Sequence, residues 1–194
     1  MQKIINKQNQ ITATAQSLFW KYGMRRVSIE EICREAKVSK MTFYKFFKNK
    51  VDLVKYILDK ITNESTETYQ AIMNQDIPFY KKVIQTIDMK LKSVDQISPE
   101  FYADLHQKAV PEISEHFHNI SHKVLEMIVN DYKKAQEEGE IRSDLKLEFI
   151  IYQLNKIFEM AGDPKLIAMY KTPKDVIMEL TRFFFYGILP RENE

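Results

Sequence analysis

The chain has 194 residues, 44% of them hydrophobic and only 4 of them glycine, and it lacks long alternating apolar runs, which excludes a mainly β fold and predicts an all-α protein of one domain or two small ones. The single cysteine, Cys33, excludes an internal disulfide and suits a reducing cytosol, and neither a signal-peptide pattern nor an apolar run of ~18 residues is found, so we expect a cytoplasmic protein with no membrane partner. The net charge of +2 is unevenly divided: residues 1–60 hold 13 Lys and Arg against 5 Asp and Glu, a net of +8, and the remainder is net acidic, which is typical of a nucleic-acid-binding segment on a body that does not bind DNA.

The first two helices are predicted from apolar spacing and from capping residues. Apolar residues recur at helical spacing from Ile11 to Tyr22, and Gly23 is placed to end this helix as a left-handed cap. Ser28 stands three residues before Glu31, which is a capping-box pattern. A second helix is therefore expected to start directly after Ser28.

A third, short helix is predicted over Lys40 to Phe46, with Ser39 as its cap. Phe43 and Phe46 are expected to face inward, which leaves small polar, aromatic and cationic side chains on the outside. A short helix of this kind after a tight turn is suited to the major groove of DNA. The residues expected to contact DNA are Ser28, Ser39, Lys40, Met41, Thr42, Tyr44, Lys45, Lys48 and Lys50.

These contacts divide into positioning and base reading. Phosphate groups are expected to be held by Ser28, Tyr44, Lys48 and Lys50. A lysine can donate to guanine, and the methyl groups of methionine and threonine can contact thymine. Base reading is therefore assigned to Lys40, Met41, Thr42 and Lys45. For each lysine the alternative is a solvated surface residue.

Six further helices are predicted, which brings the total to about nine. The fourth runs from Val51 to about Ile72, and the next three start near the prolines at 78, 99 and 111. The segment Gly162-Asp163-Pro164 is expected to break the chain between the last two helices.

The last two helices, from Leu145 to about Ala161 and from Pro173 to about Leu189, are apolar on nearly all faces. A surface helix needs only one apolar stripe, so these helices are expected to pack against the same pair in a second subunit. The alternative is burial within one subunit. The residues assigned to this homodimer interface are Phe149, Tyr152, Ile157, Val176, Leu180, Phe183 and Phe184.

The first ~60 residues resemble the tetracycline-repressor (TetR) family of transcriptional regulators. The resemblance is carried by the spaced motifs Ala15-x-x-Leu18-Phe19-x-x-x-Gly23, Val27-Ser28-x-x-x-Ile32 and Ala36-x-Val38-Ser39-x-x-Thr42-Phe43-Tyr44-x-x-Phe47, followed by Lys50 and Leu53. The later phrase Gly139-Glu140-Ile141-Arg142 is also similar to the family's pattern before a dimerisation helix. Met41 departs from it, where a smaller residue is usual, and Phe43 stands where leucine is frequent.

The resemblance implies a three-helix DNA-binding domain over residues 1–50, with the helix-turn-helix at about 27–46, and a helical-bundle regulatory and dimerisation domain over residues 51–194. It also implies a repressor that leaves a pseudo-palindromic, double-stranded operator when a small effector binds the body. An apolar or amphipathic effector is expected. The residues expected to line its pocket are Phe79, Phe101, Tyr102, Leu105, His106, Phe117, Tyr152 and Phe158.

Other functions stay open from the sequence. Glu115, His118 and His122 share one helix face at metal-ligand spacing, which is the basis of an alternative as a helical metal-binding protein or enzyme. We nevertheless expect no metal, cofactor or catalytic residue, because no cofactor motif or nucleophile–base pair is found and Cys33 falls on an apolar helix face. DNA binding without a sensor, and activation in place of repression, are further alternatives.

Overall fold

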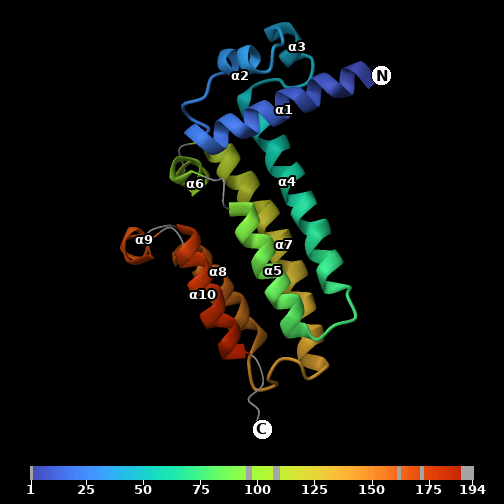
Figure 1. The fold of residues 1–194 in the computed structure, drawn as a ribbon, viewed down its shortest axis with the longest axis vertical. Coiled ribbons are helices and arrows are strands. Elements are labelled where there is room, and N and C mark those ends of the chain that lie inside the picture. Colours follow the sequence, from blue (N-terminus) through green and yellow to red (C-terminus); the bar gives the residue numbers. More distant parts are fainter. Residues whose placement is uncertain (1, 95–97, 107–109, 161–162, 171–172, 189–194) are drawn as a thin grey trace. The chain divides into compact units, whose positions relative to one another are not determined.

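The structure is a computed structural model that describes residues 2–94, 98–106, 110–160, 163–170 and 173–188. Its regular structure in these ranges is entirely helical, which confirms the all-α prediction (Figure 1). The ten helices found there are α1 (Gln2–Tyr22), α2 (Ile29–Glu35), α3 (Lys40–Tyr44), α4 (Lys50–Met73), α5 (Phe79–Val94), α6 (Pro99–His106), α7 (Pro111–Glu137), α8 (Leu147–Met160), α9 (Pro164–Tyr170) and α10 (Pro173–Ile188).

The chain forms two compact units. Unit 1 comprises residues 1–64 and 96–120, and unit 2 comprises residues 65–95 and 121–194. Helices α4 and α7 therefore begin in unit 1 and end in unit 2. These units are defined by packing and not by function, so the assignment of DNA binding to residues 1–50 stays a prediction.

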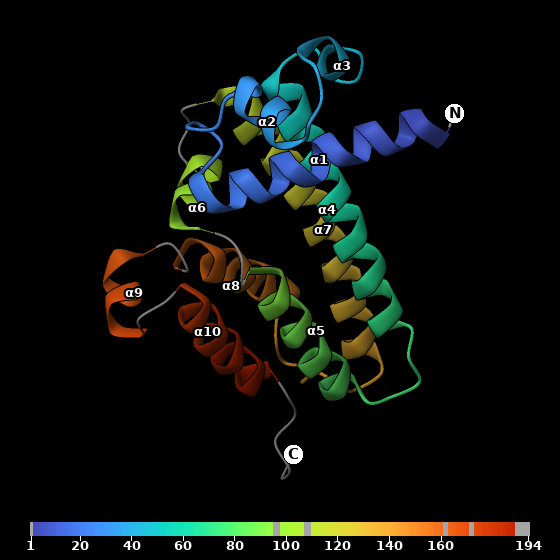
Figure 2. The same ribbon diagram turned by 45° about the horizontal axis from the view of Figure 1, so that its top comes forward.

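Unit 1 is built around the apolar face of α1. Phe19 is fully buried in it, and Gly23 ends the helix at a φ of +80°, as predicted. Helix α6 packs beside the same helix (Figure 2), where the rings of Trp20 and Phe101 stack with centroids 5.0 Å apart. The Ser98 N–H also donates to the Trp20 carbonyl at 2.9 Å. The end of α1 is thus held both by a ring of α6 and by the backbone that precedes α6.

The turn between α2 and α3 depends on Lys37, which adopts a left-handed φ of +50°. This conformation lets the Val38 N–H reach back to the Cys33 carbonyl at 3.0 Å and closes the end of α2. Glycine or asparagine usually occupies such a position. The residue type of Lys37 therefore gives no signal of the turn.

Unit 2 is organised around α5, α7, α8 and α10. Phe79, at the start of α5, packs edge-on against Tyr132 of α7 with ring centroids 5.3 Å apart. The Phe79 N–H donates to the carboxylate of Glu140, so the loop after α7 caps the start of α5. Helix α10 packs on α5, α8 and α9.

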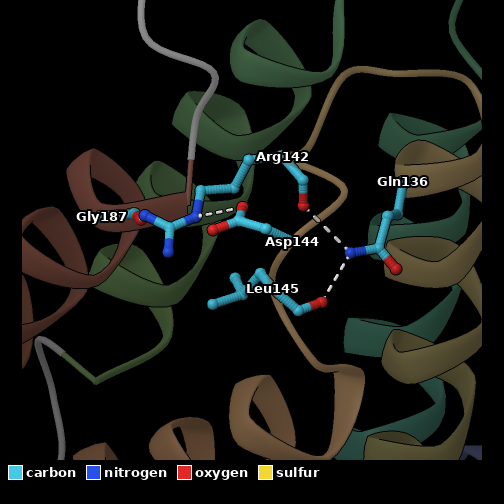
Figure 3. Close-up of polar contacts among 5 residues, drawn as sticks. All are labelled: Gln136, Arg142, Asp144, Leu145 and Gly187. Carbon is cyan, nitrogen blue, oxygen red and sulfur yellow. Dashed lines mark hydrogen bonds and ion pairs between the residues drawn. The ribbon is translucent and has the colours of Figure 1, made fainter. Parts of the chain in front are cut away.

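Polar contacts tie the same loop to the end of α10 (Figure 3). Gln136 donates to the carbonyls of Arg142 and Leu145 at 3.0 and 2.7 Å. The Arg142 guanidinium bonds to the Asp144 carboxylate at 2.9 Å and to the Gly187 carbonyl at 3.4 Å. The loop thus holds α5 through Glu140 and α10 through Arg142.

Helix α9 was not predicted. The expected break at Gly162-Asp163-Pro164 falls partly outside the described residues, but Asp163 and Pro164 form the start of a helix. The Asp163 carboxylate accepts from the Lys165 N–H at 2.8 Å, and proline suits a first helical position. The helix has 7 residues and none of them is buried. It is too short for helical spacing of apolar residues to be recognised in the sequence. Across the described ranges, no helix is long and apolar enough to cross a membrane.

Candidate nucleic-acid interface

The two helices of the predicted DNA-reading motif begin with side-chain caps. The Ser28 hydroxyl accepts from the Glu31 N–H at 3.1 Å, and the Ser39 hydroxyl accepts from the Thr42 N–H at 3.1 Å. Both caps agree with the sequence prediction. They fix where α2 and α3 start, and therefore which side chains each helix turns outward.

Helix α3 is anchored by Phe43, which is fully buried, and ends at Tyr44, two residues earlier than predicted. Phe46 follows in a turn and is half-buried against the core of unit 1. On the outer side Met41 is 70% and Tyr44 54% exposed. Large side chains exposed to this extent on so short a helix are available to another molecule.

Lys40 lies on this outer side and forms an ion pair with Glu30 of α2. Hydrogen bonding to Glu30 raises the pKa of Lys40 and lowers the pKa of the carboxyl group. Both groups are exposed, so the pair is screened by water and can open. Thr42 is half-buried, and its hydroxyl forms a hydrogen bond of 2.9 Å with the hydroxyl of Ser39. The Thr42 hydroxyl is therefore directed toward the cap of α3.

Lys50 was expected to contact a phosphate group, but in the structure its ammonium contacts the protein backbone. Its ammonium donates to the carbonyls of Met24 and Val27, each at 2.9 Å, and to that of Arg25 at 3.3 Å. Burial lowers the pKa of Lys50, and the Asp104 carboxylate opposes this shift. The side chain therefore secures the loop between α1 and α2, and direct contact with DNA by Lys50 stays a prediction.

The same loop is held from α6. The Asp104 carboxylate accepts from the Arg25 N–H at 3.0 Å and would lie 2.9 Å from a Cβ added at Gly23. Glycine at this position is thus required by close approach as well as by its positive φ. No sequence signal marked Asp104, because it is distant from Gly23 along the chain. Lys45 and Lys48, two further predicted DNA contacts, are both exposed.

A cavity of about 40 Å³ lies in unit 2. It is enclosed by side chains of α4, α5, α7, α8 and α10, which are Tyr69, Met73, Phe79, Val83, Thr86, Ile87, Lys90, Leu125, Ile128, Tyr132, Ile157, Thr181 and Phe184.

Of the predicted pocket residues, Phe79 lines this cavity. Phe101 and Leu105 are buried in the core of unit 1, where Phe117 also packs, so the structure does not bring them to the cavity. Tyr152 is 57% exposed. The side chains of Tyr102, His106 and Phe158 lie outside the described residues. Sequence reasoning missed the other lining residues, because aromatic spacing alone does not separate a cavity wall from a packed core.

The predicted interface residues fall into two groups. Phe149, Tyr152 and Phe183 are exposed, the last by 81%. By contrast, Val176 and Phe184 are buried within unit 2, Ile157 lines the cavity and Leu180 is half-buried. Tyr186, which is 81% exposed on α10, and Met160, which is exposed on α8, were not among the predicted interface residues.

The residues of the metal-binding alternative are not assembled as ligands. Within the part of the chain that the structure describes, no three His, Cys, Asp or Glu side chains are placed to hold a metal ion. His122 instead lies 3.5 Å from Glu126, one turn along α7, and His116 bonds to Asp59 at 2.7 Å.

The capped pair α2 and α3, with an exposed outer face on a buried anchor, defines a helix-turn-helix DNA-binding protein. Residues 11–57 match the family model of bacterial regulatory proteins, tetR family. Over this segment the chain is similar to transcriptional regulators of the TetR family, as its motifs indicated.

Most of the chain is similar to other proteins in sequence or in fold. It is 22% identical over 166 residues to an uncharacterized HTH-type transcriptional regulator of Haemophilus influenzae, covering 85% of this chain and 87% of that one. Among solved structures, the FadR regulator of Bacillus subtilis in complex with stearoyl-CoA is 16% identical, with a TM-score of 0.74 and coverage of 92% and 98%. A putative regulator of Saccharomonospora viridis in complex with choline is also 16% identical, with a TM-score of 0.75 and coverage of 95% and 98%. At this identity the structures share the fold with the chain.

Proposed function

We propose that the protein is a cytoplasmic, homodimeric repressor that reads a two-fold symmetric operator with α3 and is released from it by a small effector bound in unit 2. The observation that carries the DNA-reading part is the outer face of α3. Met41 and Tyr44 are solvent-exposed there, while Phe43 is fully buried and fixes the helix beneath them. Exposed aromatic and sulfur-containing side chains otherwise cost solubility, and base and sugar surfaces would cover them.

A selection of bound duplexes from a random pool tests this proposal. A dimer with two recognition helices should enrich a pseudo-palindrome with half-sites ~34–36 Å apart. A pool without any enriched motif would contradict sequence-specific recognition. An enriched motif that lacks two-fold symmetry would contradict the dimeric arrangement.

Tyr44→Ala should weaken binding to all duplexes by a similar factor, roughly tenfold, because its hydroxyl is assigned to a phosphate, which is the same in every sequence. Lys40→Ala should instead change the preferred base at one position of each half-site, since a lysine–guanine contact contributes about 1–3 kcal/mol of discrimination. Fluorescence anisotropy on the selected operator and on single-base variants measures both. A Tyr44→Ala protein that binds the operator normally at physiological salt would rule out its assignment.

The exposed aromatic residues of α8 and α10 support the homodimer. Phe149 and Tyr152 stand three residues apart on α8, Phe183 and Tyr186 do so on α10, and the two helices pack on each other (Figure 1). Adjacent helices that expose such large apolar side chains are suited to a second copy of the same surface.

Phe183→Glu should therefore convert the dimer to a monomer and weaken operator binding, because two charges would face each other across a two-fold axis. Analytical ultracentrifugation measures the change. Ile84→Glu is the matched control, since Ile84 is an apolar residue 54% exposed on α5, outside these helices, and should leave the dimer intact. If Phe183→Glu sediments as the wild type does, another surface forms the dimer.

The effector-sensing part rests on the cavity of unit 2. Its walls come from five helices, and α4 and α7, which supply part of them, continue into unit 1. A ligand that favours one arrangement of these helices would change DNA affinity through its differential binding. The stearoyl-CoA and choline of the two solved relatives differ in charge and size, so they do not name the effector of this chain.

A further inference from the structure

Two of the lysines assigned to DNA contact the protein itself. Lys40 forms an ion pair with Glu30, and the Lys50 ammonium donates to three carbonyls of the loop between α1 and α2. These contacts must be given up before either ammonium group reaches DNA, so other exposed cations of unit 1 are candidates for phosphate contacts. Arg25 and Arg26 of the same loop are exposed and were not among the predicted contacts.

The loop that carries the two arginines is held through its backbone. Met24 and Val27, which flank the arginines, are buried, and the carbonyls of both accept from Lys50 at 2.9 Å. The Arg25 N–H donates to the Asp104 carboxylate of α6 at 3.0 Å. The two arginine side chains therefore extend to the surface from a segment whose path is fixed by its neighbours.

Arg26 is also held through its side chain. Its guanidinium carbon lies 4.9 Å from the centroid of the Tyr22 ring, at the last residue of α1. The guanidinium makes no ion pair or hydrogen bond with any residue that the structure describes. A cation–π contact does not use the N–H donors of arginine, and these donors match two oxygen atoms of one phosphate. Arg26 is thus a positioned cation with its donors unused.

A second cation lies on the same ring. The Lys21 Nζ is 5.0 Å from the centroid of Tyr22, and hydrogen bonding to the Tyr22 hydroxyl raises the pKa of Lys21. Lys21 therefore stays charged, and two positive groups around one ring repel each other. A phosphate beside them would lower this repulsion. Ser28, which is expected to contact a phosphate, follows Arg26 by two residues.

We propose that Arg26 is a further phosphate contact of the DNA-reading motif, in which the guanidinium held on the Tyr22 ring donates to a phosphate of the duplex close to the group expected at Ser28. This assignment rests on the proposed function, because it adds a positioning residue to the same DNA interface. A phosphate is the same in every sequence, so the contact raises affinity for all duplexes and selects none.

The fixed loop lowers the entropy that is lost when this contact forms. Loss of the Lys50 hydrogen bonds would make the ordering of the loop more costly, but it would not remove the contact from the complex.

The salt dependence of binding by the full chain tests the contact, measured by fluorescence anisotropy on a duplex of random sequence. Arg26→Gln should reduce the slope of log affinity against log salt by about one and lower affinity roughly fivefold at ~0.15 M salt, because one phosphate fewer is neutralised. Arg26→Lys keeps the charge and should restore most of the slope. An unchanged slope in Arg26→Gln would overturn the proposal.

Arg25→Gln is the matched control, because it removes the same charge from the neighbouring exposed residue, whose guanidinium lies on no ring that the structure describes. It should change the slope clearly less than Arg26→Gln does. Equal changes in the two variants would mean that the duplex responds to the charge of the loop as a whole, and would contradict a contact by Arg26.

Uncharged methylphosphonate linkages, placed singly along the selected operator, separate a contact from a structural role. At least one linkage in each half-site should cost the wild type about fivefold in affinity and cost Arg26→Gln nothing further, because the partner of that phosphate is already gone. A structural role would not single out one linkage. If every linkage that weakens the wild type weakens the variant by the same factor, Arg26 contacts no phosphate.

Two further measurements identify the source of the phosphate and separate this proposal from the function on which it rests. Inorganic phosphate at constant ionic strength should leave the melting temperature unchanged, and a rise that Arg26→Gln abolishes would assign the site to a free anion in place of the duplex. A wild type that binds no duplex at any salt concentration would contradict the proposed function itself. Duplex binding with equal slopes in the wild type and Arg26→Gln would contradict the Arg26 contact alone.

Discussion

Lys50→Met should lower the melting temperature of unit 1 and weaken binding to every DNA duplex, without changing the salt dependence of binding. The Lys50 ammonium donates to three carbonyls of the loop between α1 and α2. A hydrogen bond that involves a charged group contributes about 1.5–3 kcal/mol net, and the contributions of three bonds from one donor do not add fully. Methionine keeps much of the aliphatic stem but leaves those half-buried carbonyls without their donor. We expect a net loss of roughly 2–4 kcal/mol.

The salt dependence distinguishes this structural role from a phosphate contact. Losing one phosphate contact reduces the slope of log affinity against log salt by about one. Lys48→Met is the matched control, because Lys48 is exposed two residues away and is assigned to a phosphate. It should reduce the slope and leave the melting temperature nearly unchanged. If Lys50→Met behaves in the same way as Lys48→Met, then Lys50 reaches the DNA and the loop is secured by other contacts.

Phe43→Ala should destabilise unit 1 by about 3–5 kcal/mol and abolish operator binding, as expected for removing a fully buried aromatic side chain. Phe43 contacts the rings of Tyr44 and Phe47, with centroids 5.4 and 5.8 Å away, so its loss leaves α3 without an anchor. Urea denaturation followed by circular dichroism measures the stability, and anisotropy measures binding.

Two variants of the same helix control this prediction. Tyr44→Ala removes a partly exposed ring that contacts Phe43 edge-on and should cost about 0.5–1.5 kcal/mol, clearly less than Phe43→Ala. Phe43→Leu keeps most of the buried volume and should cost less than Phe43→Ala. A Phe43→Ala protein with wild-type stability would mean that α3 is held by its caps and its neighbours alone.

The start of each DNA-reading helix was predictable because its signals are local. Ser28 and Ser39 cap the helices that directly follow them, and Gly23 takes the left-handed conformation that glycine alone adopts without strain. Phe43 was placed inside from helical spacing. In each case the deciding interaction spans only a few residues of chain.

The missed features depend on distant partners or on unsuitable residue types. Lys50 has the composition of a phosphate contact, but the carbonyls it binds are more than 20 residues earlier in the chain. Lys37 adopts a conformation that its side chain does not favour. On α10, Phe183 and Phe184 are adjacent and chemically identical, yet one is 81% and the other 8% exposed. In a helix that is apolar on most faces, spacing cannot tell which face meets the core.

The loop after α7 has a consequence for how the cavity widens. Glu140 holds the first residue of α5, and Arg142 holds the last turn of α10, so two walls of the cavity are bound together at the same end. Because α5 and α10 are held together at the Phe79 end, any increase in their separation is larger toward Lys90. Any opening of this cavity is therefore expected as a change in the angle between α5 and α10, with the loop as its hinge, and not as a parallel separation of the two helices.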